Sequence, residues 1–394
     1  MRSKKLAEEH FRLLKTSDGA RAGELNTSHG VVPTPVFLPV GSQATVKTLT
    51  PSDIMDTGFN MVLANTYHLY LRPGIDVIKR LGGLHRFMAW DGAILTDSGG
   101  YQIFSLAPLC RITDDGVTFR SHIDGSEHFI APELVVQYQE ALGADVIMVL
   151  DECTAYDYSQ QKVKTAMLRT HRWAERCLRV WQQRSQALYA IVQGGMFPEL
   201  RRQSVACLAE MDFPGYAIGG LSVGEPKEIT LAMVDETTSL LPENKPRYLM
   251  GVGSPEDIIE GVARGVDIFD SALPTRVARN GALFTSKGRL NIRRASYAKV
   301  DKPVDPDCDC YTCRTFSAAY LSHLFRSEEL LALRLATLHN LRFINNLVAK
   351  IRGTILDGTF STFRRDFLAG YKTTHEQTRV DQKQRWLKSR GQQG

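Results

Sequence analysis

Residues 132–152 read PELVVQYQEALGADVIMVLDE, and this stretch decides the fold class. Its first part, Pro132–Leu142, repeats apolar residues with the 3.6-residue period of a helix. After a glycine, Val146–Leu150 forms a continuous apolar run, which is typical of a strand buried on both faces. A helix followed directly by such a strand predicts an α/β protein built on a parallel sheet.

The same alternation extends in both directions through residues 1–270. Lys162–Arg179 is another segment with the helical period. Eight runs have the length and composition of buried strands: Val36–Val40, Met61–Ala64, Ala93–Thr96, Val146–Leu150, Leu188–Val192, Gly215–Ile218, Arg247–Met250 and Val266–Phe269. Eight strands without an obvious reversal of strand order predict a (β/α)8 TIM barrel. A doubly wound sheet stays open as the alternative, because periodicity does not show whether a sheet closes.

Two insertions interrupt this alternation. Arg111–Ile130 carries Asp-Gly turns between alternating segments, which predicts an antiparallel meander. Ala282–Arg293 predicts a hairpin, and a long helical stretch follows from about Ser327 to Val348. We therefore expect three parts: a barrel in residues 1–280, a hairpin and zinc-binding subdomain in 281–350, and a closing helical segment with a basic polar tail in 351–394.

The composition is that of an ordinary globular protein, with 394 residues of which 43% are hydrophobic and 23% charged. It excludes disordered, collagen-like and disulfide-scaffold classes. No apolar run approaches the roughly 18 residues of a membrane helix, and the basic N-terminal stretch lacks the apolar core of a secretory signal. Three of the seven cysteines lie within residues 308–313. We expect a reduced, cytoplasmic protein.

Charge is unevenly distributed along the chain. Residues 271–394 hold 22 Lys and Arg against 10 Asp and Glu, whereas residues 1–270 hold 26 against 33. A basic C-terminal third suits a polyanion such as a nucleic acid. Solvated basic helix faces alone would give the same asymmetry.

The cysteine cluster Cys308, Cys310 and Cys313 places three thiolates on one tight loop. Soft thiolates in a reducing compartment select zinc. His339, in the long helical stretch, is the favoured fourth ligand, and His323 is the nearer competitor. Four protein ligands leave no open coordination position, so this zinc is expected to be structural.

Acidic and amide side chains follow several predicted strands. Asp97, Asp151 and Asp270 each end an apolar run, Gln193 follows another, and residues 219–220 are a glycine pair in the same position. A single Asp after a strand is often only a helix N-cap, but in a barrel these ends carry function. Two acids, an amide and exposed glycine backbone suit a planar heterocycle such as guanine. Two acids also suit glycosyl transfer, one as nucleophile and one as acid/base.

Several strings together resemble one family in order along the chain, from about residue 12 to 370. They are TDSGGYQ (96–102), DECT (151–154), QGG (193–195), YAIGGLSVGEP (216–226), RYLMGVGSPED (247–257), FDSALPTRVARNG (269–281), CDCYTC (308–313) and LHNLR (338–342). The sequence resembles the queuine tRNA-ribosyltransferases, which are tRNA-guanine transglycosylases of queuosine biosynthesis.

The resemblance implies a role for each matching residue. Asp270 is implied as the nucleophile that attacks the ribose, and Asp97 as the general acid/base. The implied base-binding residues are Asp97, Ser98, Gly99, Gly100, Tyr101, Asp151, Cys153, Gln193, Gly219, Gly220, Leu221 and Met250. The implied RNA-binding residues are Gly251, Val252, Gly253, Ser254, Pro255, Glu256, Asp257, Thr275, Arg276, Val277, Ala278 and Arg279. The implied zinc ligands are Cys308, Cys310, Cys313 and His339.

The resemblance also implies partners and a substrate. Cys153 and Val223 are similar to the bacterial forms, which insert 7-aminomethyl-7-deazaguanine in place of the wobble guanine of tRNAs with a GUN anticodon. It further implies a covalent glycosyl-aspartate intermediate, one zinc ion per chain and a homodimer.

Other readings of the sequence remain as alternatives. They are an enzyme that inserts queuine, a noncatalytic tRNA-binding relative, a zinc module that binds RNA without chemistry, and a barrel glycosidase. A noncatalytic relative would have lost pocket or nucleophile residues. A glycosidase would line its site with tryptophans, but the four tryptophans of this chain lie outside the strings above.

Overall fold

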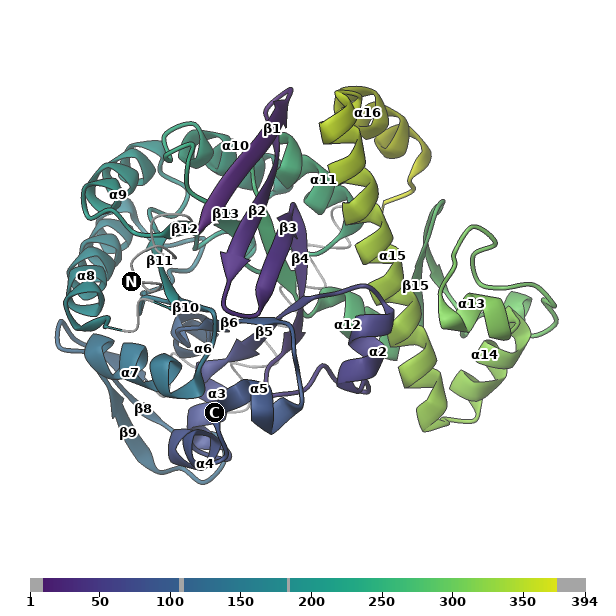
Figure 1. Ribbon diagram of the computed structural model, residues 1–394, viewed down its shortest axis with the longest axis horizontal. Coiled ribbons are helices and arrows are strands. Elements are labelled where there is room, and N and C mark those ends of the chain that lie inside the picture. Colours follow the sequence, from purple (N-terminus) through teal and green to yellow (C-terminus); the bar gives the residue numbers. More distant parts are fainter. Residues whose placement is uncertain (1–9, 106–109, 183–184, 374–394) are drawn as a thin grey trace.

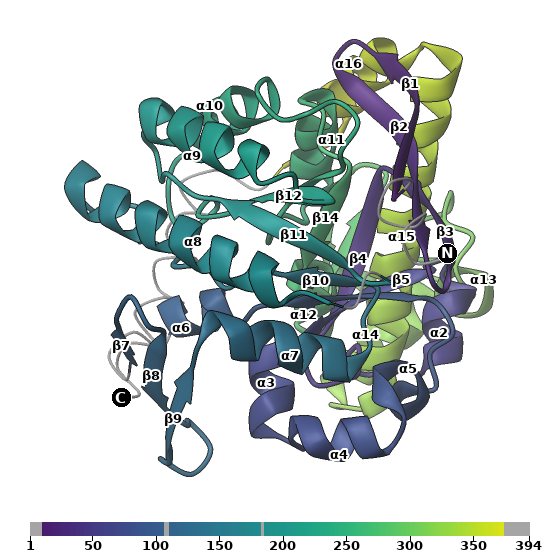
Figure 2. The same ribbon diagram turned by 60° about the vertical axis from the view of Figure 1, so that its left-hand side comes forward.

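A closed parallel barrel forms the centre of the molecule (Figures 1 and 2). The computed structural model describes residues 10–105, 110–182 and 185–373. The barrel strands are β4 (Val36–Gly41), β5 (Met61–Asn65), β6 (Ala93–Asp97), β10 (Val146–Met148), β11 (Ala187–Val192), β12 (Gly215–Ile218), β13 (Arg247–Leu249) and β14 (Ile268–Ser271). Each strand pairs with the next along the chain in this order.

The barrel closes where its last strand pairs with its first. β14 runs parallel to β4, with Ile268 opposite Val36 and Ser271 opposite Pro39. The predicted (β/α)8 barrel is therefore confirmed, and the doubly wound sheet is excluded. Each of the eight apolar runs predicted to be strands overlaps one of these barrel strands; the predicted runs at β10 and β14 extend two residues beyond the strand at one end.

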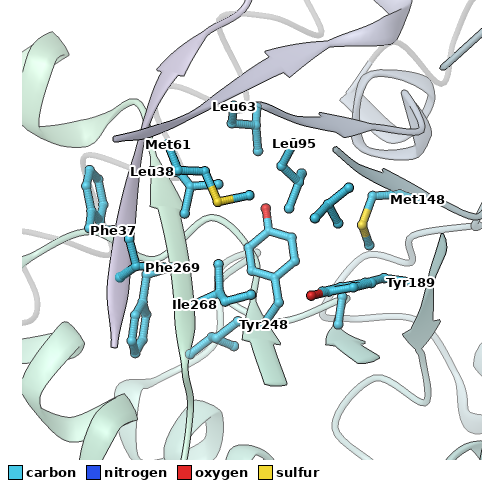
Figure 3. Packing of buried hydrophobic residues seen from close by; sticks show 14 of the residues in the cluster. Phe37, Leu38, Met61, Leu63, Leu95, Met148, Tyr189, Tyr248, Ile268 and Phe269 are labelled. Carbon is cyan, nitrogen blue, oxygen red and sulfur yellow. The ribbon is translucent and has the colours of Figure 1, made fainter. Parts of the chain in front are cut away.

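Buried hydrophobic side chains from the barrel strands pack together in the core, as Figure 3 shows for part of it. Leu38, Leu95 and Met148 are fully buried there. Two tyrosines, Tyr189 and Tyr248, are fully buried in the same interior. Their hydroxyl groups need hydrogen-bond partners because buried polar groups are costly without them.

Helices cover the outside of the barrel. Between β4 and β6 lie α2 (Pro51–Asp56), α3 (Thr66–Leu71), α4 (Ile75–Arg80) and α5 (Gly83–Met88). The later strands are followed by α6 (Gly100–Ser105), α7 (Pro132–Leu142), α8 (Gln160–Val180), α9 (Pro198–Glu210), α10 (Lys227–Thr238), α11 (Pro255–Ala263) and α12 (Leu273–Arg279). Within the described residues, no helix combines the length and apolar character needed to span a bilayer.

The longest of the described helices, α15 (Leu330–Asp357), packs along the barrel beside β4 and beside two N-terminal strands, β1 (Phe11–Ser17) and β2 (Ala20–Thr27). Its residues Leu341, Ile344 and Ile351 are fully buried in the main core. The helix ends at Gly358, whose φ of 75° is the left-handed conformation typical of a C-terminal glycine. It therefore runs beyond the stretch expected from the sequence, and the domain boundary expected between residues 350 and 351 falls inside it. A further helix, α16 (Phe360–Gly370), follows.

Both predicted insertions are present. β7 (Cys110–Ile112), β8 (Val117–Arg120) and β9 (Glu127–Ile130) form the antiparallel meander between α6 and α7. β15 (Ala282–Thr285) and β16 (Gly288–Asn291) form the hairpin. After the hairpin come η2 (Ala295–Tyr297), α13 (Tyr311–Thr315) and α14 (Ala318–Arg326). In Figure 1, β15, α13 and α14 lie on the side of α15 that faces away from the barrel.

An N-terminal antiparallel sheet is present that the sequence analysis did not predict. Its strands are β1 (Phe11–Ser17), β2 (Ala20–Thr27) and β3 (Gly30–Thr34). It lies at the N-terminal end of the barrel strands, where His10 Nε2 is 2.7 Å from the hydroxyl of Tyr189. Arg21 Nε also donates to the buried carboxylate of Asp267 over 3.1 Å. The sheet therefore covers the end of the barrel opposite the strand-end acids.

Candidate active site

The strand-end residues singled out by the sequence gather at the C-terminal end of the barrel. Asp97 is the last residue of β6, and Asp270 lies in β14. Asp151 follows β10, whereas Gln193 and Gly219 directly follow β11 and β12. Parallel strands in a closed barrel end on one rim, which is where barrel enzymes carry their chemistry. The fold thus brings these side chains to a common site.

Asp97 lies among groups that act on its charge in opposite directions. Burial raises its pKa to about 7, and the negative charges of Asp270 and Asp151 add to this rise. The Thr66 N–H donates to Oδ1 over 3.1 Å, and the Asn65 amide donates to Oδ2; both bonds favour the carboxylate. At neutral pH, Asp97 can therefore both give and accept a proton.

Asp270 has a different set of partners. The hydroxyl of Tyr248 donates to Oδ1 over 2.6 Å, and the N–H of Gly251 donates to the same oxygen over 2.8 Å. Burial raises the pKa of Asp270, and these two hydrogen bonds oppose the rise. Among the described residues both donors bind Oδ1, so Oδ2 is the oxygen left for a reacting carbon.

Asp151 is a buried acceptor fixed by two side chains. The Ser98 hydroxyl donates to Oδ1 over 3.1 Å, and Gln193 Nε2 donates to Oδ2 over 2.8 Å. Burial raises the pKa of Asp151 to about 6, against the effect of both hydrogen bonds. The Oε1 atom of Gln193 is buried and has no partner within the described part of the chain. Asp151 and Gln193 together therefore offer hydrogen-bonding groups to a polar ligand.

Two glycines in this site pack directly against those side chains. A Cβ at Gly100 would lie 2.0 Å from Oδ1 of Asp151. Gly220 has a φ of +67°, and a Cβ there would lie 2.5 Å from Oε1 of Gln193. Both positions therefore require glycine, because a side chain would displace the acceptors.

The remaining base-binding candidates differ in exposure. Tyr101, in the first turn of α6, is 38% exposed, whereas Leu221 is buried. Met250 directly follows β13 and is partly buried, as is Cys153. Gly99 is buried and adopts a φ of +89°. A flat ligand at this rim would therefore meet an aromatic ring and a thioether that solvent still reaches.

The cysteine cluster converges on one histidine of α15. The Nδ1 atom of His339 lies 3.7 Å from the sulfur of Cys308, 3.5 Å from that of Cys310 and 3.2 Å from that of Cys313. Ligands on tetrahedral zinc, with Zn–S of about 2.3 Å and Zn–N of about 2.0 Å, are about 3.5 Å apart. The four residues therefore fit a metal ion of the zinc type, and His323, which is exposed on α14, does not belong to the cluster.

The surroundings of His339 fix its ligand atom. Its Nε2 atom lies 2.6 Å from the carbonyl oxygen of Phe284, so Nε2 carries the proton and Nδ1 faces the sulfurs. The neighbouring thiols of Cys308 and Cys313 lower the pKa of Cys310, which favours a thiolate there. This cluster joins α13 to α15, the helix that packs on the barrel.

Comparison with known sequences identifies the family. Residues 16–373 match the family described as queuine tRNA-ribosyltransferase. The chain belongs to this family.

Bacterial relatives named queuine tRNA-ribosyltransferase agree with this assignment. One from Dehalococcoides mccartyi (strain BAV1) is 62% identical over 96% of this chain and 97% of its own length. One from Herpetosiphon aurantiacus is 58% identical over 91% and 92%, and one from Desulforamulus reducens is 57% identical over 89% and 94%. As a member of the queuine tRNA-ribosyltransferase family, the protein is an enzyme of the pentosyltransferase class.

The segments that the family resemblance assigns to RNA are mostly buried. In residues 251–257, Gly251 is exposed, Asp257 is partly buried and the residues between them are buried. In α12, Arg276 is exposed and Arg279 is partly buried. Burial and the charge of Arg276 lower the pKa of Arg279, so the two cations lie close together beside β14.

Some functional groups were missed by the sequence analysis. Asn65 and Thr66 hold Asp97, and Tyr248 holds Asp270. Asn65 directly follows the predicted strand Met61–Ala64, which is the same signal that marked Asp97. Tyr248 lies within a predicted strand. It was counted there as an apolar residue, so its hydroxyl group was not considered as a hydrogen-bond donor.

Proposed function

We propose that this member of the queuine tRNA-ribosyltransferase family exchanges the wobble guanine of tRNAs with a GUN anticodon for 7-aminomethyl-7-deazaguanine, as a step of queuosine biosynthesis. The observation that carries this proposal is the contrast between Asp97 and Asp270 at one end of the barrel. Burial raises the pKa of both, that of Asp97 to about 7. Asp97 accepts one hydrogen bond on each oxygen, whereas both donors to Asp270 bind Oδ1 and leave its Oδ2 without a donor among the described residues. Environments that differ in this way assign acid/base and nucleophile roles to two like side chains.

In the first half of the reaction, Oδ2 of Asp270 attacks C1′ of the ribose. The bond between C1′ and guanine breaks, and protonated Asp97 gives its proton to the departing base. The product is an ester between Asp270 and the ribose of the tRNA. Tyr248 and Gly251 support this step because they favour the ionised form of Asp270 before attack.

In the second half, Asp97 accepts a proton from the incoming base. The base attacks C1′, and the ester to Asp270 breaks, which returns the carboxylate. Two displacements at one carbon retain the β-configuration of the ribose. One glycosidic bond replaces another, so the exchange needs no ATP.

The base is recognised by Asp151, Gln193 and the backbone around Gly220. Guanine and its 7-deaza analogues present N1–H and an exocyclic amine, which require acceptors. The Asp151 carboxylate supplies acceptors that Ser98 and Gln193 hold in place. Tyr101 and Met250 provide the faces between which the ring stacks.

The choice of the aminomethyl base rests on Cys153 and Val223. Val223 is buried, and its N–H donates to the carboxylate of Glu225 over 2.9 Å. A branched, buried side chain at this position supports a small substituent on the incoming base. Insertion of queuine, the bulkier base after which the bacterial relatives are named, is the alternative.

The tRNA is proposed to bind across the C-terminal end of the barrel. Arg276 and Arg279 lie on α12, directly after the strand that bears Asp270. Two neighbouring guanidinium groups suit the phosphates on either side of the reacting nucleotide. The excess of basic residues after position 270 also suits contact with the negatively charged anticodon arm of the tRNA.

The metal ion held by Cys308, Cys310, Cys313 and His339 is proposed to be zinc with a structural role. Three thiolates and one imidazole fill a tetrahedral shell, so the ion would cross-link the chain and offer no open position for a reaction.

The division into a barrel, a zinc-binding subdomain and a closing segment is also a proposal, and so is the homodimer. Size-exclusion chromatography with light scattering tests the homodimer.

The direct test of this function is base exchange. The protein is incubated with a GUN-anticodon tRNA and radiolabelled guanine, and incorporation into RNA is measured. We expect incorporation that is chased out irreversibly by 7-aminomethyl-7-deazaguanine and poorly by queuine. A tRNA with adenosine at the wobble position is the matched control and should take up no label. Equal chase by queuine would overturn the substrate, and no incorporation would overturn the reaction.

A further inference from the structure

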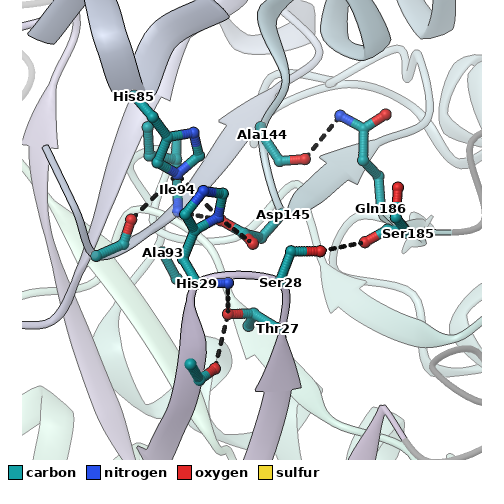
Figure 4. A network of polar contacts seen from close by, with 12 residues as sticks. Thr27, Ser28, His29, His85, Ala93, Ile94, Ala144, Asp145, Ser185 and Gln186 are labelled. Atoms are coloured by element: carbon teal, nitrogen blue, oxygen red, sulfur yellow. Dashed lines mark hydrogen bonds and ion pairs between the residues drawn. The ribbon is translucent and has the colours of Figure 1, made fainter. Parts of the chain in front are cut away.

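Two histidines and an aspartate meet at the N-terminal end of the barrel, away from the strand ends that carry Asp97 and Asp270 (Figure 4). His29 lies in the turn between β2 and β3, His85 lies in α5, and Asp145 immediately precedes β10. One ligand atom from each of the three lies within 4.8 Å of the others. These three residues have no role in the base exchange proposed above.

The distances place both imidazole rings on the same carboxylate. His29 Nδ1 lies 2.8 Å from Oδ1 of Asp145, and His85 Nε2 lies 3.4 Å from Oδ2. The two rings stack with centroids 3.5 Å apart and an interplanar angle of 13°. Each ring therefore has one nitrogen facing a different oxygen of the same carboxylate.

Asp145 is an anion built into the protein. Its side chain is fully buried, and the N–H of Ile94 donates to Oδ2 over 2.9 Å. Its own N–H donates to the carbonyl oxygen of Ile94 over 2.8 Å, which fixes the backbone as well. Hydrogen bonds from His85 and His29 outweigh burial and lower its pKa. A buried carboxylate of this kind needs cationic partners.

The turn that carries His29 is held in place by its neighbours. The Thr27 hydroxyl donates to the carbonyl oxygen of Gly30 over 2.7 Å, and the N–H of His29 donates to that hydroxyl oxygen over 3.2 Å. The hydroxyl of Ser28 donates to the carbonyl oxygen of Ser185 over 3.2 Å. The turn is thus tied to the barrel before any ion binds, which reduces the entropy cost of binding.

We propose that His29, His85 and Asp145 form a second metal site, which takes a divalent ion of the Zn2+ type with water as a further ligand. Two imidazoles and one carboxylate are a donor set suited to zinc. The His29 side chain is 34% exposed, so solvent reaches the site from that side. The carbonyl oxygen of Gly92, 3.1 Å from His85 Nε2, is one more oxygen at its edge.

This site acts on the fold and takes no part in base exchange. Its three ligands come from the N-terminal sheet, from the helices after β5 and from the start of β10. An ion there clamps the sheet onto the end of the barrel whose residues serve stability. The stacked rings are nearly parallel, so their nitrogen lone pairs do not meet at one point. Binding of one ion by both rings therefore requires the exposed His29 ring to turn its edge toward the ion.

The test uses the full-length protein with its cysteine cluster loaded with zinc. Equilibrium dialysis against Zn2+, followed by metal analysis, should show a second equivalent in the wild-type protein. His29→Gln and His85→Gln each remove one imidazole and keep a polar side chain, and each should weaken the second equivalent by at least about tenfold. His323→Gln, an exposed histidine on α14, is the matched control and should bind as the wild type does.

Thermal unfolding provides the second readout. Added Zn2+ should raise the melting temperature of the wild-type protein and of His323→Gln, and should have a smaller effect on His29→Gln. Circular dichroism and base exchange without added Zn2+ verify that each variant is folded. The proposal is overturned if the wild type binds no second equivalent, or if His29→Gln and His85→Gln bind it as tightly as the wild type. Either result would leave the cluster as a hydrogen-bonded trio only.

Discussion

Asp97 and Asp270 have the same side chain, but their carboxylates accept hydrogen bonds from different donors. Their positions after apolar strands could be read from the sequence, because a strand and its end have a local signal. Their donors could not, because Asn65 and Thr66 reach Asp97 from the end of β5, and Tyr248 reaches Asp270 from β13, through a pairing and register of neighbouring strands that the sequence does not show. The two acids could therefore be predicted from the sequence, whereas the donors around them are known only from the structure.

The pH dependence of exchange should follow Asp97. Its protonated form gives a proton to the departing base, and that form is lost as the pH rises through its pKa of about 7. Asn65→Ser keeps a capping oxygen for α3 but removes the amide donor that favours the carboxylate. The pKa of Asp97 should rise further, and the alkaline limb of kcat/KM against pH should move to higher pH. An unmoved limb in this variant would assign the titration to another group.

Tyr248→Phe should slow exchange by about 10- to 100-fold, since it removes a hydrogen bond to a charged group. The pKa of Asp270 rises when this donor is lost, so the loss should be largest at low pH. Steady-state rates at several pH values measure the effect. Tyr189→Phe is the matched control, because Tyr189 is buried in the same interior but bonds His10 at the other end. A loss of equal size in the control would show that both variants merely disturb packing.

At the scale of elements, continuous apolar strands were predictable and the N-terminal sheet was missed. The barrel strands are buried on both faces, so successive residues are apolar. Such a strand can be recognised without knowing which of its residues point inward. β1 alternates between partly buried and exposed residues, and its signal is weak. The turn signal Asp18-Gly19 was present and could have indicated the hairpin of β1 and β2.

Loss of His339, the proposed fourth ligand of the metal ion, should destabilise the junction between α13 and α15. His339→Ala removes one of four ligands, so the ion at the cysteine cluster should be lost and the free energy of unfolding should fall by at least about 2 kcal/mol. Metal analysis and urea unfolding measure these two effects. His323→Ala on α14 is the control and should keep both the ion and the stability. Full retention of the ion in His339→Ala would remove His339 from the ligand set.

In the molecule as a whole, the two ends of the barrel carry different groups. The C-terminal end carries the acids, and the N-terminal end carries the sheet and the cluster of His29, His85 and Asp145. The number and order of the barrel strands could be predicted from the sequence. The packing of α15 across a predicted domain boundary could not, because it depends on contacts with β1, β2 and β4 far away in the chain.

The distribution of charge predicts a salt-sensitive interaction with tRNA. Arg276→Ala should weaken tRNA binding and reduce the slope of log affinity against log salt by about one, as expected for one lost phosphate contact. Filter binding over a range of KCl concentrations measures the slope. Arg12→Ala is the matched control, because Arg12 is an exposed arginine on β1 at the opposite end. An unchanged slope in Arg276→Ala would place the phosphate contacts elsewhere.

Isolation of the covalent intermediate tests the role of Asp270 as the nucleophile. The protein is mixed with a GUN-anticodon tRNA, quenched under denaturing conditions, digested and analysed by mass spectrometry. The wild type should yield a ribose ester on Asp270, and Asp270→Asn should yield no adduct and lose exchange by at least about a thousandfold. An adduct on another residue, or exchange by Asp270→Asn at a rate near that of the wild type, would contradict the account.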